Sequence, residues 1–139
     1  MSEVPRTYAT PDLRSALLIA YVLFVLALFN GATAILGIVL VYIKRGEARG
    51  TLWESHARNL IRVFWISVAV FVVLLAALLQ GFGGLFFSLY TTNGNPPPAL
   101  VGALALMVPA LALAFILFAV WYLYRTLRGL VRALENNPY

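Results

Sequence analysis

Charged residues in this chain are confined to three short stretches, and long apolar runs separate them. The charged stretches are residues 1–14, 44–62 and 125–135. Between them, residues 15–43 form a run of 29 positions and residues 63–124 form a run of 62 positions without a charged side chain. Each run exceeds the ~18–20 apolar residues that a helix needs to cross a hydrocarbon core of about 30 Å. The pattern therefore predicts membrane-spanning segments.

Both apolar runs are expected to be helical. Backbone groups in lipid must bond within their own segment or in a closed barrel, and neither run shows the period-two alternation of barrel strands. We predict an all-α integral membrane protein with three to four apolar helices and amphipathic juxtamembrane segments, forming a single transmembrane domain over residues 1–139. The predicted helices cover about residues 11–29, 32–46, 52–80 and 99–134, and the predicted outer loop covers residues 82–98.

The first run has two interpretations, because Asn30-Gly31 is a turn-favouring dipeptide in its middle. Residues 16–43 form either one tilted helix about 42 Å long or part of a hairpin of two short helices, residues 11–29 and 32–46. Pro11 favours a helix start at residue 11 in both cases. The second helix of the hairpin is short, which allows a hairpin that enters the bilayer without fully crossing it.

The second run is preceded by a clear helix start. Residues 51–54, Thr-Leu-Trp-Glu, have the form of a capping box, in which two side chains satisfy free backbone N–H groups. The next turns are polar, and residues 63–79 are wholly apolar, so an interfacial segment should lead into a span. Gln80-Gly81 and the following Gly83-Gly84 are expected to end this helix.

The last predicted helix carries Pro109, an expected kink, and ends in an amphipathic segment. In that segment Arg125, Arg128 and Arg132 fall on one helical face and leucines on the other. We expect the segment to lie along the membrane surface or to extend the helix against it.

Composition and charge indicate an orientation in the membrane. Hydrophobic residues make up 63% of the chain and charged residues 11%, whereas soluble domains are about one-quarter charged. Lys and Arg number two before the first run, five in residues 44–62, none in residues 82–98 and three after Tyr124. Because basic residues favour the cytoplasmic side, we expect a multi-pass membrane protein with the 44–62 connection and the C-terminus in the cytoplasm. The hairpin is narrowly favoured, because it also places Arg6 and Arg14 there.

Candidate catalytic chemistry is sparse. His56 is the only histidine and the chain has no cysteine, so we expect no metal site, no cofactor and no enzyme activity. Proton and ion carriers place ionisable groups at membrane depth, where this chain offers only Asn30, Ser67 and Gln80. The net charge of +5 follows from the membrane flanks, so no nucleic-acid partner is expected.

Two sets of residues remain as candidates for binding. Basic groups near a membrane surface attract anionic headgroups at about 1 kcal/mol per cation, although the same charges also act as solvated topology determinants. The candidate lipid or partner contacts are Lys44, Arg45, Arg49, His56, Arg58, Arg62, Arg125, Arg128 and Arg132. Small residues four apart let helix backbones approach. The candidate helix-packing residues are Gly37, Ala77, Gly81, Ala99, Ala103, Ala110 and Ala114.

Four segments carry a resemblance to a known family: residues 38–45 ending in Lys-Arg, residues 53–59 with a His-Ala step, residues 61–65, and residues 124–130. Over about residues 15–135 the chain resembles small bacterial membrane proteins of the Tic-twenty-like domain-of-unknown-function family, whose relatives include MamF-like magnetosome proteins. The resemblance implies a polytopic inner-membrane protein with no established enzyme activity. The Pro-rich segment 93–98 departs from the shorter connection expected there.

These observations lead to a first functional hypothesis and an alternative. The chain is expected to be a non-catalytic membrane protein that acts as an accessory or scaffold subunit, or as a homo-oligomer, through helix packing and a basic cytoplasmic surface. Its expected partners are membrane lipids and another membrane protein or a second copy. The alternative is a component of a transport or translocation pathway, or a protein that binds anionic lipid.

Overall fold

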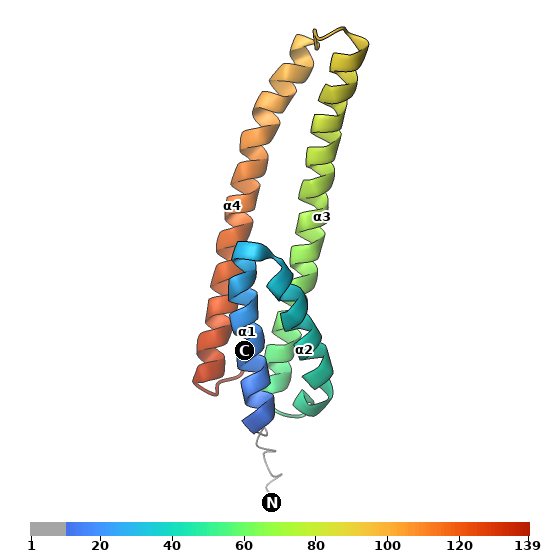
Figure 1. Cartoon of the computed structure of the whole chain (residues 1–139). Helices are drawn as coiled ribbons and strands as arrows, with labels where there is room; N and C mark the ends of the chain where they lie inside the picture. Colours follow the sequence, from blue (N-terminus) through green and yellow to red (C-terminus); the bar gives the residue numbers. More distant parts are fainter. Residues whose placement is uncertain (1–10) are drawn as a thin grey trace, which may run out of the picture. The chain divides into compact units, whose positions relative to one another are not determined.

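Four helices make up the fold of this chain in a computed structural model that describes residues 11–139 (Figure 1). They are α1 (Pro11–Asn30), α2 (Ala32–Ala48), α3 (Trp53–Thr91) and α4 (Pro98–Leu134), and no strand occurs among these residues. Helices α1, α3 and α4 are long and apolar enough to cross a membrane. The fold is therefore that of an all-helical membrane protein, as the charge-free runs predict.

The helices form two compact units. The first, unit 1, contains the chain up to Ile66 together with Trp121–Tyr139, and the second, unit 2, is Ser67–Val120. Helices α3 and α4 each contribute to both units. All polar clusters discussed below lie in unit 1.

A tight turn joins α1 and α2 into the predicted hairpin rather than one long helix (Figure 1). Gly31 adopts φ 61°, a left-handed conformation that glycine enters without a Cβ clash. The Asn30 side-chain oxygen accepts a hydrogen bond from the Thr33 N–H at 3.2 Å, which satisfies a free donor at the start of α2. The other ends of the hairpin are tied by Lys44, whose Nζ lies 2.6 Å from the Asp12 carboxylate.

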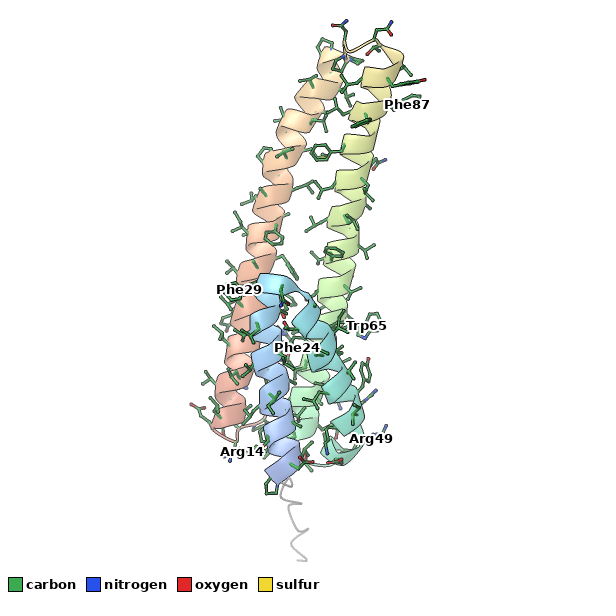
Figure 2. The ribbon with its side chains drawn as sticks, viewed as in Figure 1. Arg14, Phe24, Phe29, Arg49, Trp65 and Phe87 are labelled. Carbon is green, nitrogen blue, oxygen red and sulfur yellow. The ribbon has the colours of Figure 1, made fainter. Side chains whose placement is uncertain are left out.

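The two hairpin helices approach closely at one glycine. A Cβ at Gly37 would lie 2.8 Å from the Phe24 ring and 3.3 Å from the Ala20 carbonyl oxygen. Figure 2 shows Phe29 near the hairpin turn and Arg14 and Arg49 at the opposite end of the hairpin. The charged ends of both helices therefore lie on the same side of the hairpin.

One apolar stripe of α1 forms the centre of unit 1. Its residues recur every three or four positions, which places them on one helical face, and all are buried: Leu13, Leu17, Tyr21 and Phe24. Phe24 packs edge-on against Phe64 of α3, with ring centroids 6.5 Å apart. Its backbone carbonyl also accepts a 2.7 Å hydrogen bond from the Tyr122 hydroxyl of α4. Helices α1, α3 and α4 are thus held together at the level of Phe24.

Helix α3 begins at Trp53, within one residue of the predicted start, and its first turn uses the capping residues. The Thr51 hydroxyl accepts a hydrogen bond from the Trp53 N–H at 3.2 Å. The Glu54 carboxylate accepts one from the Gly50 N–H at 3.1 Å and one from Arg58 at 2.9 Å. The Thr51 bond satisfies a backbone donor that the helix start leaves free, and the Glu54 bonds tie the first turn to Gly50 and Arg58.

The end of α3 differs from the prediction, because the helix runs through the glycines to Thr91 instead of ending at Gln80. The expected loop over 82–98 shrinks to the few residues between Thr91 and Pro98. Glycine is tolerated in membrane helices, and the apolar side chains that follow Gly81 continue the packed face. The actual stop is Asn93, whose φ of 48° lets the Gly94 N–H bond back to the Leu89 carbonyl at 2.9 Å.

Unit 2 is a pair of apolar helical segments with a regular seam. Half-buried residues recur at spacings of three and four, as in a coiled coil: Val70, Leu74, Ala77, Gly81, Leu85 and Ser88 on α3, and Leu100, Leu104, Met107 and Leu111 on α4. Gly81 lies against Met107 and Leu104. Helix α4 continues unbroken through Pro109.

We predict that Gly37→Ala destabilises the hairpin, because the added methyl group must displace a buried phenylalanine ring. Overpacking of this kind costs about 1–3 kcal/mol. Gly46→Ala is the matched control in the same helix, since a Cβ there meets nothing within 4 Å. Thermal unfolding in detergent should show a lower midpoint for Gly37→Ala alone. Equal midpoints for the two variants would contradict the close approach of α1 and α2.

Candidate functional site

Polar side chains from three helices meet in the interior of unit 1. Tyr21 comes from α1, His56 and Asn59 come from α3, and Arg125 comes from α4. Tyr21 and His56 have no exposed surface, and Asn59 is 4% exposed. Buried polar groups destabilise a fold unless they are hydrogen-bonded, so their partners decide whether this arrangement is stable.

These side chains form one chain of hydrogen bonds. The Arg125 Nε donates to Asn59 Oδ1 at 3.2 Å, and Asn59 Nδ2 donates to the Tyr21 hydroxyl at 3.4 Å. The Tyr21 hydroxyl lies 3.1 Å from His56 Nδ1, and His56 Nε2 lies 2.8 Å from the backbone carbonyl oxygen of Asn137. We call these five residues the polar chain.

The chemistry of the end groups fixes the direction of every bond in the polar chain. A guanidinium only donates and a carbonyl only accepts, so Asn59 must turn its oxygen toward Arg125 and His56 must carry its hydrogen on Nε2. His56 Nδ1 then accepts from the Tyr21 hydroxyl, which in turn accepts from Asn59. A neutral His56 imidazole is therefore sufficient to complete all the hydrogen bonds of the polar chain. Aligned hydrogen bonds polarise one another, which strengthens each member.

The end of α4 supplies the last acceptor. Asn136 adopts φ 54°, and the Asn137 N–H bonds back to the Arg132 carbonyl at 2.9 Å. This is the turn that commonly closes a helix at a residue in the left-handed conformation. It directs the segment after α4 back over α3, where the Tyr139 N–H donates to the Ser55 hydroxyl at 3.0 Å.

A hollow opens beside the polar chain on the surface of unit 1. It has a volume of about 160 Å³ and is lined by Ser55, Arg58, Asn59, Arg62, Arg125 and Tyr139. We call it the arginine hollow. Arg58 and Arg62 are exposed, whereas Arg125 is half-buried with its guanidinium carbon 5.9 Å from the Trp121 ring centroid and 5.5 Å from that of Tyr139. Cations stack favourably on aromatic faces, so both rings help to hold Arg125.

The predicted basic contacts therefore separate into groups. The structure brings Arg58, Arg62 and Arg125 together in the arginine hollow. Lys44 is engaged elsewhere, because it pairs with Asp12 at 2.6 Å and with Glu47 at 2.9 Å. These carboxylates raise the pKa of Lys44 above its ordinary value, with the Asp12 hydrogen bond as the largest cause.

The remaining predicted contacts lie outside the hollow. Arg45 and Arg49 are exposed around the end of α2. Arg128 donates to the Tyr124 hydroxyl at 2.9 Å, and Arg132 donates to the Pro138 carbonyl at 3.3 Å. His56 lies in the interior as a member of the polar chain, not on a contact surface.

The predicted helix-packing residues also divide. Gly37 is buried against Phe24, and Ala77 and Gly81 lie on the seam of unit 2. The four alanines of α4 are exposed and lie off that seam: Ala99, Ala103, Ala110 and Ala114. Among the predicted packing residues, Gly37, Ala77 and Gly81 therefore contribute to helix packing within the described part of the chain, and the alanines of α4 do not.

Tyr21, Asn59 and Tyr139 belong to the site but were not predicted as site residues from the sequence. Tyr21 is one aromatic residue in a long apolar run, and its only signal is the three-to-four spacing that it shares with Leu17 and Phe24. Asn59 lies among polar residues at the start of α3, where an exposed amide is ordinary. Tyr139 reaches the site only because the turn at Asn136 reverses the chain.

The chemistry of this site favours binding of an anion. Three guanidinium groups face one hollow, and in the described part of the chain neither Arg62 nor Arg125 has a carboxylate within 4 Å. No group of three His, Cys, Asp or Glu that would suit a metal ion occurs among the described residues. Guanidinium groups suit phosphate, because their planar N–H donors match its oxygens.

Fold and site together define a helical membrane protein with a hydrogen-bonded polar interior and a basic hollow in one unit. Comparisons with protein-family models, with curated proteins and with solved structures find no match for this chain.

We predict that Tyr21→Phe destabilises unit 1, because it removes the hydroxyl that joins Asn59 to His56. Leaving buried donors and acceptors unsatisfied costs about 1–3 kcal/mol. Tyr42→Phe is the matched control: its exposed hydroxyl accepts one 3.1 Å bond from Trp65, and surface changes of this size stay within about 0.5 kcal/mol. Chemical unfolding in detergent followed by tryptophan fluorescence measures the difference. A Tyr21→Phe protein as stable as Tyr42→Phe would show that the polar chain does not hold the unit together.

Proposed function

We propose that this chain is a non-catalytic protein of the bacterial inner membrane that acts by binding, as an accessory or scaffold subunit or as a homo-oligomer. The observation that carries the proposal is that the polar groups of unit 1 fall into two sets, one bonded in the interior and one exposed. Tyr21, His56 and Asn59 are buried and bonded to one another across helices. Exposed cations such as Arg45, Arg49 and Arg62 take no part in these interior bonds, so unit 1 presents a basic surface that is available for binding.

Unit 2 supports a role in helix contacts within the membrane. Large apolar side chains are exposed along both of its helices, for example Phe71, Phe86 and Leu106 at 65%, 80% and 75% exposure. Water would oppose such a surface, whereas lipid or another apolar helix accepts it. The exposed alanines of α4 add a face on which a further helix packs closely in this proposal.

The proposed orientation places the charged ends of the hairpin and the arginine hollow on the cytoplasmic side. It rests on the excess of Lys and Arg in residues 44–62 and after Tyr124. Arg6 lies outside the described residues. Because the chain has no cysteine, Ser2→Cys and Asn93→Cys provide single labelling sites. Labelling of both from the outer side would contradict this orientation.

Membership of the Tic-twenty-like family remains a prediction from short sequence motifs.

The test is extraction of the protein with its native lipid in polymer discs, followed by mass spectrometry of the proteins and lipids that co-purify. The proposal expects a second protein in fixed ratio, or a second copy of this chain. An unrelated membrane protein of the same size is the control for carry-over.

Two variants assign the contact to a surface. Arg45→Gln with Arg49→Gln removes exposed charge from unit 1, and Ala103→Leu with Ala110→Leu fills the small-residue face of α4. Loss of the partner in one pair but not in the other identifies the surface used. Recovery of a monomer with no partner in all preparations would contradict the accessory and oligomer roles together.

A further inference from the structure

We infer that the arginine hollow is a binding site for one phosphate group, carried by a membrane lipid or by a soluble phosphate ester. The inference deepens the proposed function, on which it rests, by naming a ligand for one part of the basic surface.

The donors of the hollow are suited to an anion. Arg125 uses its Nε for Asn59, which leaves the four N–H groups of its terminal nitrogens for a ligand. Arg62 is exposed and has no carboxylate partner among the described residues. Arg58 pairs through one terminal nitrogen with Glu54 at 2.9 Å, so its charge is partly balanced. Two free cations and a third, partly paired one therefore face the same space.

The hollow is also preorganised. Arg125 is fixed by the bond to buried Asn59 and by the rings of Trp121 and Tyr139. A long side chain that is already ordered loses less conformational entropy when it binds, and this raises affinity. Arg45 and Arg49 lack such supports, so the structure distinguishes the hollow from the exposed cations around the end of α2.

Size and position agree with a phosphate group. A volume of about 160 Å³ is well above the ~10–15 Å³ that holds one water, so a tetrahedral anion fits with water around it. Arg62 directly precedes the charge-free run at Val63, and Arg125 directly follows its end at Tyr124. On the proposed topology both cations lie at the level of lipid headgroups, where phosphate is abundant.

The experiment measures lipid retained by single proteins in native mass spectrometry. Purified protein in neutral detergent is titrated with phosphatidylglycerol, and with phosphatidylcholine as the zwitterionic control. Arg62→Gln removes a hollow cation that makes no described structural bond, and Arg14→Gln makes the same change on an exposed residue of α1 outside the hollow. Matched thermal midpoints show that both variants are folded.

Wild-type protein should retain phosphatidylglycerol in preference to phosphatidylcholine. Arg62→Gln should bind it about fivefold more weakly, the factor that corresponds to ~1 kcal/mol per cation, and Arg14→Gln should bind it as wild type does. An equal loss in both variants would overturn the hollow while leaving binding by the general basic surface intact. Equal retention of both lipids by the wild-type protein would also overturn the phosphate site. The partner test in native discs gives an independent result, so failure of the phosphate site is distinguishable from failure of the proposed function.

A competition arm separates the two sources of phosphate. Glycerol 3-phosphate is added to the complex with phosphatidylglycerol. Displacement at low millimolar concentration identifies a site that also accepts soluble phosphate esters, whereas retention identifies a site that requires the lipid. Both results support phosphate as the ligand when Arg62→Gln weakens the binding.

Discussion

The structure of unit 1 depends on the hydrogen bonds among polar side chains that three helices bury in its interior. The Tyr21 hydroxyl makes such bonds with two residues of α3 at once, Asn59 and His56. The ring of Tyr21 also fills the space beside Gly129 of α4, where a Cβ would come within 2.6 Å of its hydroxyl oxygen. One side chain thus joins α1 to both other long helices, by hydrogen bonds to one and by close packing to the other.

From this interior follows the character of the surface. Asn59 is fixed by Tyr21, Arg125 is fixed by Asn59, and the arginine hollow gains an oriented guanidinium in place of a mobile one. The interior chain and the surface hollow are consecutive parts of one hydrogen-bonded arrangement. A protein that acts by binding benefits from such an arrangement, because the entropy of ordering the site is lost on folding and not on association.

Much of the fold was predictable from local signals, and the exceptions have physical causes. Asn30-Gly31 and the Thr51–Glu54 box determined the hairpin turn and the start of α3, because both act through neighbouring backbone groups. The prediction that the glycines after Gln80 end α3 was wrong. A glycine that ends helices in water is tolerated in a membrane helix where apolar packing continues on both sides. The helix ends instead at Asn93, which adopts the left-handed conformation that commonly closes a helix.

The site was predictable only in part. Arg58, Arg62 and Arg125 were predicted as charges beside the spans, but their convergence depends on a contact between α3 and α4 in unit 1, where Arg125 bonds to Asn59. The roles of Tyr21 and Tyr139 depend on contacts across 35 residues or more, to which no local pattern is sensitive. His56 was a candidate because it is the only histidine in the sequence. The structure places it in the interior as a member of the polar chain.

The central claim is that the α1–α2 hairpin and the adjoining ends of α3 and α4 form one cooperative unit held by the polar chain. Hydrogen–deuterium exchange of the protein in lipid discs tests it most directly, because the backbone amides of residues 53–60 and 125–133 precede or follow the charge-free run and owe little protection to lipid. The account predicts that these amides and those of residues 13–21 exchange slowly and with a common opening free energy. Fast exchange in residues 13–21 beside slow exchange in residues 125–133 would contradict it.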